Sequence, residues 1–415
     1  MSEQTNLVPK RRFKEFQNTD AWEQRKLGDL LENAYQGINT AGDKVEYSES
    51  GVKILQSKHI TSGNITFDDA RYLDRDRYSE YLPKYVPNVD DILFANIGTI
   101  GPSAVVTEVK EFLIAWNILK MTPKKESNAK FIQLQLQRLN IKRYFESVTT
   151  GNATKFVNKD EMLRTQIIVP EKKEQSKIGE FFANLDNLIT LHQRKLEKAK
   201  ALKSAYLSEM FPAEGEREPK RRFAGFTQAW EQRKLGEIAD IIGGGTPSTS
   251  NEEYWNGEID WYSPVEIGEQ AYVNSSQKKI TELGLRKSSA KILPVGTVLF
   301  TSRAGIGNTA ILAKEGATNQ GFQSIVPHKD EIDSYFIYSR THELKRYGET
   351  NGAGSTFVEV SGKQMAQMPI FIPTLEEQKK IGSFFERLDN LIALHQRKLE
   401  KLQNLKKAYL NEMFV

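Results

Sequence analysis

Residues 178–211 read IGEFFANLDNLITLHQRKLEKAKALKSAYLSEMF, and residues 381–414 read IGSFFERLDNLIALHQRKLEKLQNLKKAYLNEMF. An alignment without gaps places identical residues at 25 of the 34 positions. Apolar residues recur at steps of three or four in both copies, a spacing typical of an amphipathic helix. The chain therefore carries two copies of one long helix, each at the end of a half-chain, and this repeat decides the fold.

The apolar stripe of each predicted helix can be followed along its whole length. In the first copy it consists of Ile178, Phe181, Leu185, Leu188, His192, Leu196, Ala199, Leu202, Tyr206 and Met210. In the second copy it consists of Ile381, Phe384, Leu388, Leu391, His395, Leu399, Leu402, Leu405, Tyr409 and Met413. Pro170 and Pro373 precede the two helices, and Pro212 ends the first. A helix over residues 174–211 is about 57 Å long at 1.5 Å per residue.

Because the two stripes are nearly the same, we expect the helices to pack against each other. A parallel pair places both half-chain modules at one end, whereas an antiparallel pair places one at each end. The antiparallel pair is favoured, and it separates the modules by about one to two turns of DNA at roughly 34–36 Å per turn.

Shorter repeats flank the helices. The sequence PKRRF at residues 9–13 returns at 219–223, and WEQRKLG at 22–28 returns at 230–236. Between these anchors and the helices, the two inserts share little sequence. We call the repeated segments, which are the PKRRF and WEQRKLG sequences and the long helix of each half, the frame. Because the two frames are nearly identical and the inserts are not, we expect the frames to dock in the same way and the inserts to recognise different targets.

Each insert is expected to be mixed α/β. Short β-rich runs at 52–55, 91–94, 298–300 and 370–372 alternate with turns, and helical periods are present at 129–146 and 332–347. The predicted fold is therefore α/β (mixed α+β), with two modules joined by two long helices packed as an antiparallel coiled coil, and an internal pseudo-two-fold repeat. The expected boundaries are 1–170 for the first module, 171–212 for the central helix, 213–373 for the second module and 374–415 for the last helix.

Bulk composition narrows the class of protein. The chain has 415 residues, 39% of them hydrophobic and 27% charged, which is ordinary for a globular protein. The absence of cysteine excludes disulfides and thiolate metal sites. With no apolar signal region and no apolar run of 18 residues or more, a cytoplasmic location is expected. The net charge of +4 is weak evidence for nucleic acid, because a nucleic-acid footprint depends on clustering of basic residues.

The motifs of the expected enzyme classes are missing. No Pro-Pro pair exists, which excludes the Asn/Asp-Pro-Pro-aromatic motif of amino-methyltransferases. The triplet Gly243–Gly245 is followed by Thr246-Pro247, which blocks immediate helix entry. No G-x-x-x-x-G-K-[ST] phosphate loop is present. The sequence therefore predicts neither a catalytic site nor a metal site in this chain.

At this point several stretches carry a resemblance to a known family. They are Gly244 to Pro247 through Tyr254 to Gly257 and Trp261, Ser302-Arg303 with Gly305 and Gly307, Thr318 to Gly321, and Pro373 to Gln378 leading into Ile381 and Leu388-Asp389. The first half matches more loosely, at Asn96 to Gly101 and Val169 to Gln175. Together with the duplicated helix, they make the whole chain similar to the specificity subunit of a type I restriction–modification system.

The resemblance implies a non-catalytic subunit that directs other subunits to DNA. Each module is then a target recognition domain that reads one half of a bipartite double-stranded DNA site. The helices set the half-site spacing and dock two modification (methyltransferase) subunits, which hold S-adenosylmethionine and methylate adenine. Restriction (endonuclease and translocase) subunits, with ATP and magnesium, join the larger complex. The chain itself binds no cofactor and no membrane.

Two other functions remain open on the sequence. A coiled-coil adaptor that binds proteins without reading DNA is the runner-up. A stand-alone nuclease or methyltransferase is the third, and the missing motifs argue against it.

Polar loops rich in Gly, Asn, Thr and Ser are the candidate DNA-binding segments, although ordinary turn chemistry explains each loop equally well. Arg303 is the leading candidate for a guanine reader or a phosphate clamp. The candidate residues are Lys58, His59, Asn96, Thr99, Asn152, Thr154 and Lys155 in the first module, and Thr246, Ser302, Arg303, Asn319, Gln320, Ser355 and Thr356 in the second.

Overall fold

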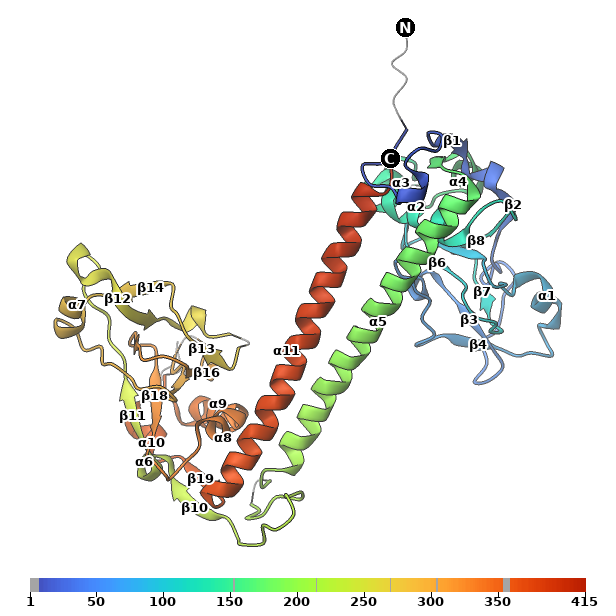
Figure 1. The fold of residues 1–415 in the computed structure, drawn as a ribbon. Helices are drawn as coiled ribbons and strands as arrows, with labels where there is room; N and C mark the ends of the chain where they lie inside the picture. The colour runs from blue at the N-terminus through green and yellow to red at the C-terminus, as the bar shows by residue number, and fades with distance from the viewer. Residues whose placement is uncertain (1–6, 152–153, 214, 269, 304, 354–358) are drawn as a thin grey trace. The chain divides into compact units, whose positions relative to one another are not determined.

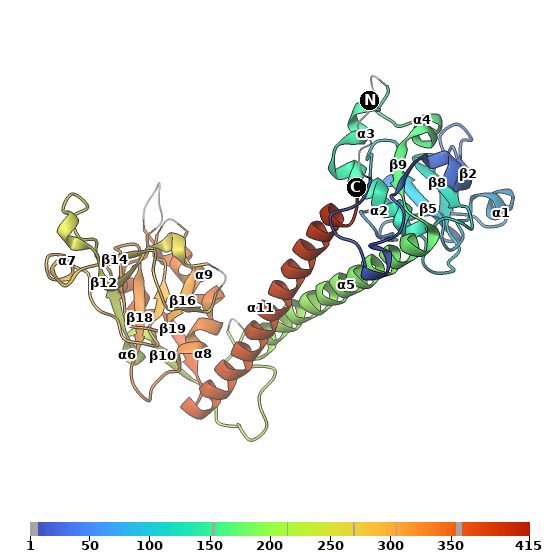
Figure 2. The same cartoon turned by 45° about the horizontal axis from the view of Figure 1, so that its top comes forward.

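A computed structural model describes residues 7–151, 154–213, 215–268, 270–303, 305–353 and 359–415. The chain divides into two compact units (Figures 1 and 2). Unit 1 takes in the chain up to Gln193 together with Lys398–Val415, and unit 2 is Arg194–Arg397. The four segments expected from the sequence treat each long helix as a separate segment. The two units instead divide both long helices between them. Each module is thus completed by a piece of helix from the other half of the chain.

The two long helices are α5 (Lys172–Glu209) and α11 (Leu375–Glu412). Their bounds confirm the predicted helices to within a few residues. Because each unit contains a stretch of both helices, the pairing is seen within each unit. In unit 1, the rings of Phe181 and Tyr409 lie 5.1 Å apart, and in unit 2 those of Tyr206 and Phe384 lie 4.9 Å apart. Higher numbers on α5 meet lower numbers on α11, so the helices pack antiparallel, as predicted.

Ion pairs between the helices repeat the same reciprocal pattern. In unit 1, Lys406 Nζ lies 2.7 Å from Asp186 Oδ1, and in unit 2, Lys203 Nζ lies 2.5 Å from Asp389 Oδ1. The first aspartate belongs to the first helix copy and pairs with a lysine of the second, while the other pair reverses the roles. Such reciprocity is expected when two copies of one sequence pack antiparallel.

The predicted apolar stripe is only partly the packing face. Leu188, Leu202, Leu391 and Leu405, which the stripe includes, have exposed fractions of 46%, 41%, 41% and 38%. Their neighbours at Leu185, Leu196, Leu388 and Leu399 are buried. The seam between two helices is narrower than the stripe, so the outer leucines remain accessible.

Unit 1 contains a four-stranded antiparallel sheet in the order β2-β8-β5-β6 and a three-stranded sheet in the order β4-β3-β7. A separate antiparallel pair joins β1 to β9. The strands are β1 (Glu23–Lys26), β2 (Leu31–Gln36), β3 (Val52–Leu55), β4 (Arg71–Leu73), β5 (Ile92–Ala95), β6 (Ser103–Val105), β7 (Leu113–Ile114), β8 (Ile118–Pro123) and β9 (Gln166–Val169). The short helices are α1 (Leu82–Tyr85), α2 (Ala129–Ile141), α3 (Tyr144–Ser147) and α4 (Lys159–Arg164), with 3-10 turns η1 (Lys14–Phe16), η2 (Leu27–Leu30), η3 (Ser57–His59) and η4 (Ser79–Tyr81).

Unit 2 repeats this topology with one added edge strand. Its sheets run β11-β18-β15-β16-β13 and β14-β12-β17, and β10 pairs with β19. The strands are β10 (Glu231–Lys234), β11 (Ala239–Gly243), β12 (Trp255–Tyr262), β13 (Tyr272–Val273), β14 (Lys278–Ile280), β15 (Val298–Phe300), β16 (Thr309–Leu312), β17 (Ala317–Thr318), β18 (Gln323–Pro327) and β19 (Pro369–Ile372). The helices are α6 (Leu235–Ile238), α7 (Glu282–Arg286), α8 (Ser334–Ser339), α9 (Thr341–Asn351) and α10 (Gly362–Ala366), with 3-10 turns η5 (Glu252–Tyr254) and η6 (Pro264–Glu266). The divergent inserts therefore adopt one fold, which confirms the predicted internal repeat.

Matching caps and cores explain why different inserts fold alike. The Asn128 side chain accepts a hydrogen bond from the Phe131 N–H and caps α2, and Asp333 caps α8 through the Phe336 N–H in the same way. In unit 1 the core is closed by the end of α11, where Phe414 packs between rings of the module; Phe211 at the end of α5 does the same in unit 2. The clustered aromatic side chains are Trp22, Phe131, Phe182 and Phe414 in unit 1, and Trp230, Phe336, Phe385 and Phe211 in unit 2.

The frame sequence PKRRF is fastened to each long helix by a buried ion pair. Arg12 donates through Nε and Nη2 to the two oxygens of Glu174, at 2.7 and 2.6 Å, and its side chain is 5% exposed. Arg222 makes the same two contacts with Glu377, at 2.9 and 2.7 Å. The repeated sequence therefore forms the same ion pair with the long helix in each unit.

Candidate nucleic-acid interface

In unit 1, a tight hairpin between β5 and β6 presents the first candidate loop. Gly98 and Gly101 have φ angles of 78° and 107°, in the left-handed region that favours glycine. The Gly101 N–H donates to the Ala95 carbonyl at 3.0 Å and closes the loop. Thr99 at its tip is exposed. The glycines thus turn the chain sharply enough to hold a small polar side chain out in solvent.

Asn96, at the base of this hairpin, is used inside the fold. It is 2% exposed, and its Nδ2 donates to the Val157 carbonyl at 3.1 Å. Its Oδ1 accepts from Gln36 Nε2 at 2.7 Å. The Gly98 N–H also donates to the Lys155 carbonyl, at 3.4 Å. These bonds hold the hairpin against the segment that carries the exposed Thr154 and Lys155, so the two predicted segments lie side by side.

Lys58 and His59 lie on η3, which Asn117 ties to the same hairpin. The Ser57 N–H donates to Asn117 Oδ1 at 3.1 Å, and the Asn96 N–H donates to the Asn117 carbonyl at 3.3 Å. His59 is 3% exposed, and its Nδ1 accepts from the Gln56 N–H at 2.8 Å. Burial, and then the charge of Lys58, lower the pKa of His59, so its ring is neutral near pH 7. Lys58 is the exposed cation of this turn.

Sequence reasoning missed Trp116, which lies next to Asn117 and is 49% exposed. Its carbonyl accepts from Gln36 Nε2, and its N–H donates to the Ile38 carbonyl at 2.7 Å. The polar cluster of unit 1 therefore carries a large exposed aromatic ring. A tryptophan in a turn between two buried β-strands is the signal that could have found it.

In unit 2, the hairpin between β15 and β16 occupies the equivalent position. The Thr301 hydroxyl donates to the Gly305 carbonyl at 2.8 Å and accepts from the Asn308 N–H at 2.9 Å. Ser302 is fully buried, and its N–H and hydroxyl both donate to the Gly321 carbonyl, at 2.8 and 3.1 Å. The Val360 N–H donates to the Ser302 carbonyl, just as the Val157 N–H does to that of Asn96. Ser302 and Asn96 therefore occupy equivalent positions in the two units.

Arg303 follows Ser302 and points its charge outward. Its side chain is 35% exposed, and Nη1 lies 3.9 Å from Glu359 Oε2. This distance exceeds that of a charge-assisted hydrogen bond, and a half-exposed ion pair contributes little. The guanidinium can therefore exchange this partner for a ligand at small cost.

Thr246, Asn319 and Gln320 come together beside this hairpin. The Thr246 hydroxyl donates to Gln320 Oε1, and the Gly245 N–H donates to the Thr318 carbonyl at 2.8 Å. A Cβ at Gly244 would lie 2.0 Å from the Asn319 carbonyl oxygen, so only glycine permits this approach. The Asn319 Oδ1 accepts from the Gly321 N–H at 2.8 Å and shapes the turn. Gly244 to Pro247 therefore pack against the turn at Thr318 to Gly321.

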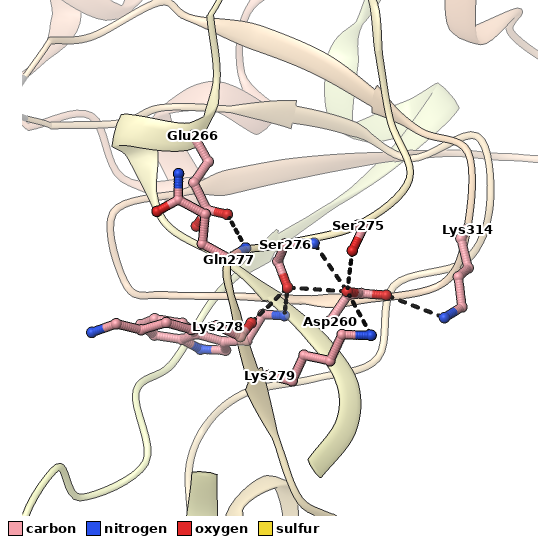
Figure 3. A network of polar contacts seen from close by, with 9 residues as sticks. Asp260, Glu266, Ser275, Ser276, Gln277, Lys278, Lys279 and Lys314 are labelled. Carbon is pink, nitrogen blue, oxygen red and sulfur yellow. Dashed lines mark hydrogen bonds and ion pairs between the residues drawn. The ribbon is translucent and has the colours of Figure 1, made fainter. Parts of the chain in front are cut away.

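A buried carboxylate holds the neighbouring loop of unit 2 (Figure 3). Asp260 has no exposed side-chain surface and accepts from the Ser276 N–H at 3.0 Å and hydroxyl at 3.1 Å. Lys314 Nζ lies 3.2 Å and Lys279 Nζ 3.4 Å from its oxygens. Burial alone raises the pKa of Asp260, but the hydrogen bonds from Ser276 and the two lysines outweigh it and hold the pKa below its usual range.

The same loop is tied to the turn that follows β12. Glu266 accepts from the Gln277 N–H at 2.7 Å (Figure 3). Glu266 also accepts from the Ser263 N–H at 2.9 Å and so caps η6. Asp260 therefore joins three segments: the loop at Ser276, Lys279 on β14, and Lys314 in the turn between β16 and β17.

Of the fourteen candidates, Asn152, Ser355 and Thr356 lie outside the described residues. Within the described part of the chain, no group of three His, Asp or Glu side chains is arranged to hold a metal ion. No helix in that part has the length and apolarity that crossing a bilayer requires.

Sequence comparisons show which known proteins this chain resembles. The family model described as "Type I restriction modification DNA specificity domain" matches residues 19–201 and again 227–404. The MjaIX type I specificity subunit of Methanocaldococcus jannaschii is 34% identical over 189 residues, which are 45% of this chain and 44% of that protein. The alignment therefore spans less than half of that relative. A putative MjaX specificity subunit from the same organism is 25% identical over 94% of this chain and 92% of its own length.

A solved structure matches the fold of the whole chain. The S subunit of a type I restriction–modification system from M. genitalium superposes with a TM-score of 0.65 at 14% identity, covering 98% of this chain and 99% of that one. The relatives are named as specificity subunits, which are recognition components and not catalysts. Because the family model covers both modules, this chain belongs to the type I restriction modification DNA specificity family and is a specificity subunit of such a system.

Proposed function

We propose that each unit reads one half of a bipartite target in double-stranded DNA. One observation carries the proposal: two inserts with little shared sequence gather polar side chains on equivalent loops of one fold. Equivalent loops on nearly identical frames suit the same task on different base sequences. Direct readout requires side chains at base edges in the major groove, where all four base pairs differ.

Exposure divides the candidates into two roles. The accessible residues are proposed to contact bases or phosphates, and they are Lys58, Thr99, Thr154 and Lys155 in unit 1, and Thr246, Arg303, Asn319 and Gln320 in unit 2. The buried His59, Asn96 and Ser302 are proposed to hold the loops in place, because their polar atoms are bonded inside the fold. Asn152, Ser355 and Thr356 remain predictions for direct contact.

The helices are proposed to set the half-site spacing and to dock two modification subunits. Three leucines of unit 1, Leu188, Leu191 and Leu405, and their three sequence equivalents in unit 2, Leu391, Leu394 and Leu202, are all more than a third exposed. Two matching sets of exposed apolar side chains suit two copies of one partner. Those partners would bring S-adenosylmethionine and methylate adenine, and restriction subunits would bring ATP and magnesium. This chain would hold no cofactor and act in the cytoplasm.

The test is to map methylated adenines by single-molecule sequencing in cells that carry this chain with a cognate modification subunit. Cells with the modification subunit alone are the control. A bipartite motif that depends on this chain is expected, and its two halves give the two targets. A copy in which residues 29–170 come from another family member should change one half only. No new motif from a complex that assembles, or a change in both halves, would contradict the proposal.

A further inference from the structure

Unit 1 has a cavity of about 390 Å³ whose lining includes none of the candidate DNA-binding residues. It is formed by α2, α5, the end of α11 and the turn at residues 62–64. Four basic side chains line it: Arg138, Lys142, Lys406 and Lys407. A volume of this size falls within the range of small-molecule sites in proteins, roughly 300–1,000 Å³.

The carboxylate in this cavity does not balance these charges. Asp186 is shared between Lys406 and Lys130, each at 2.7 Å from one of its oxygens. Within the residues that the structure describes, neither Lys142 nor Lys407 ion-pairs with a carboxylate. The cavity therefore carries more positive than negative charge.

Arg138 is the most constrained of the four. It donates to Gln135 Oε1 at 3.3 Å and to the Val415 backbone oxygen at 2.8 Å, and it lies over the ring of Phe414. Burial lowers the pKa of Arg138 to about 10, a direction expected for a cation that lacks compensation. The charge of Arg138, and then burial, lower the pKa of Lys142. The two cations therefore repel each other in the absence of an anion.

The remaining lining has the character of a binding site. Ile141, Ile189 and Leu410 supply apolar surface, and Gln137 and Asn411 supply amides. The Gln137 Oε1 atom is buried without a hydrogen-bond partner. A buried polar atom without a partner is costly, and a ligand in the cavity can relieve that cost.

Unit 2 serves as an internal comparison. The ion pair between Lys406 and Asp186 has its equivalent there in Lys203 with Asp389. Counted from the two N-caps, Asn128 and Asp333, the position of Arg138 is taken by Glu343, which pairs with Arg340. The helix-copy equivalent of Lys407 is Ser204. Unit 2 nevertheless keeps an arginine at the same ring, because Arg340 lies over Phe211 as Arg138 lies over Phe414. By the same count from the N-caps, the position of Lys142 is taken by Tyr347, so the cations that only unit 1 carries are Lys142 and Lys407.

We propose that this cavity binds a phosphate-bearing anion, supplied either by a free small molecule or by the DNA backbone. Lys142 and Lys407 provide exposed charges on the lining, and Arg138 provides a charge held by its hydrogen bonds. Phosphate suits this arrangement, since its several oxygens can accept from separate cationic donors at once. The site goes beyond reading of bases and stands whether or not the polar loops read DNA.

The test is a calorimetric titration of the full chain with inorganic pyrophosphate and with ATP. The variant Lys142→Ser/Lys407→Ser changes two exposed side chains, and the second change copies the residue of the other helix. The matched control is Lys398→Ser/Lys401→Ser, which removes the same charge from α11 without touching the cavity lining. Saturable binding is expected, with an affinity that falls about tenfold or more in the cavity variant and stays unchanged in the control.

A second arm identifies the source of the phosphate. If pyrophosphate and ATP do not bind, retention of a duplex of unrelated sequence should weaken in the cavity variant. The slope of log affinity against log salt should then fall by about two, one for each lost lysine contact. That outcome assigns the phosphate to the DNA backbone, whereas small-anion binding assigns it to a free molecule. If the cavity variant behaves like the control in both arms, the proposal is wrong, and base reading by the loops is unaffected.

Discussion

Replacement of Arg12 by alanine tests whether the repeated PKRRF sequence holds each module to its helix. The change leaves the Glu174 carboxylate, which has no exposed side-chain surface, without the two donors at 2.7 and 2.6 Å. Removal of one partner from a buried pair costs about 3–5 kcal/mol, mainly because the other charge stays buried alone. For a unit of this size, each kcal/mol lowers the melting temperature by roughly 2–4 °C, so a drop of about 6–20 °C is expected for unit 1.

The neighbouring residue provides the control. Arg11 also forms an ion pair, with Glu412 at 2.6 Å, but the two side chains are 56% and 39% exposed. Arg11→Ala should therefore leave the unfolding midpoint of unit 1 close to that of the parent. Thermal unfolding followed by hydrogen exchange and mass spectrometry gives a melting temperature for each unit, because every peptide reports the protection of its own segment. Equal effects of Arg11→Ala and Arg12→Ala would refute the argument from burial.

Three further predictions concern the helices and unit 2. Four residues inserted after Lys198 add one helical turn of about 6 Å, so the methylated half-sites should move apart by roughly two base pairs while their bases stay the same; an unchanged spacing in methylome data rejects the spacer role. Arg303→Ala should relax discrimination at one base of one half-site by about 1–3 kcal/mol if it reads guanine, whereas uniform weakening across competing duplexes in a binding assay marks a phosphate contact. Asp260 has a lowered pKa in the folded state, so its contribution is complete above its unfolded pKa, about 3.9, and is lost as the pH falls through the folded value. The stability gap between the parent and Asp260→Asn should therefore be large at pH 7 and shrink in acid, and a gap that does not change with pH contradicts the assigned charge.

Much of the architecture was predictable, because the hydrophobic periodicity and the internal repeat of the sequence determine it. The long helices, the strands at 52–55 and 298–300, and the antiparallel pairing all follow from patterns that local physics produces. The shared topology of the inserts was expected only in outline, because strand order depends on contacts between residues far apart in the sequence.

The candidate site was less predictable, because the polarity of a side chain does not show whether it points into the fold or into solvent. Asn96 and Thr99 occupy one short loop, yet the first is buried and the second is exposed. A buried amide satisfies backbone groups of the next segment, and the sequence of the loop alone does not contain that partner. Trp116 shows the converse, because an aromatic side chain that the polar-loop pattern does not include lies on the surface.

The position of Phe414 in the core of unit 1 has a consequence for how the chain is made. Unit 2 is a continuous stretch, Arg194–Arg397, and all of its core is synthesised before Leu410 is added. Unit 1 begins first, but its core lacks Leu410, Met413 and Phe414 until the end of α11 emerges. The module that is translated first is therefore completed last, and until then part of its apolar core has no cover.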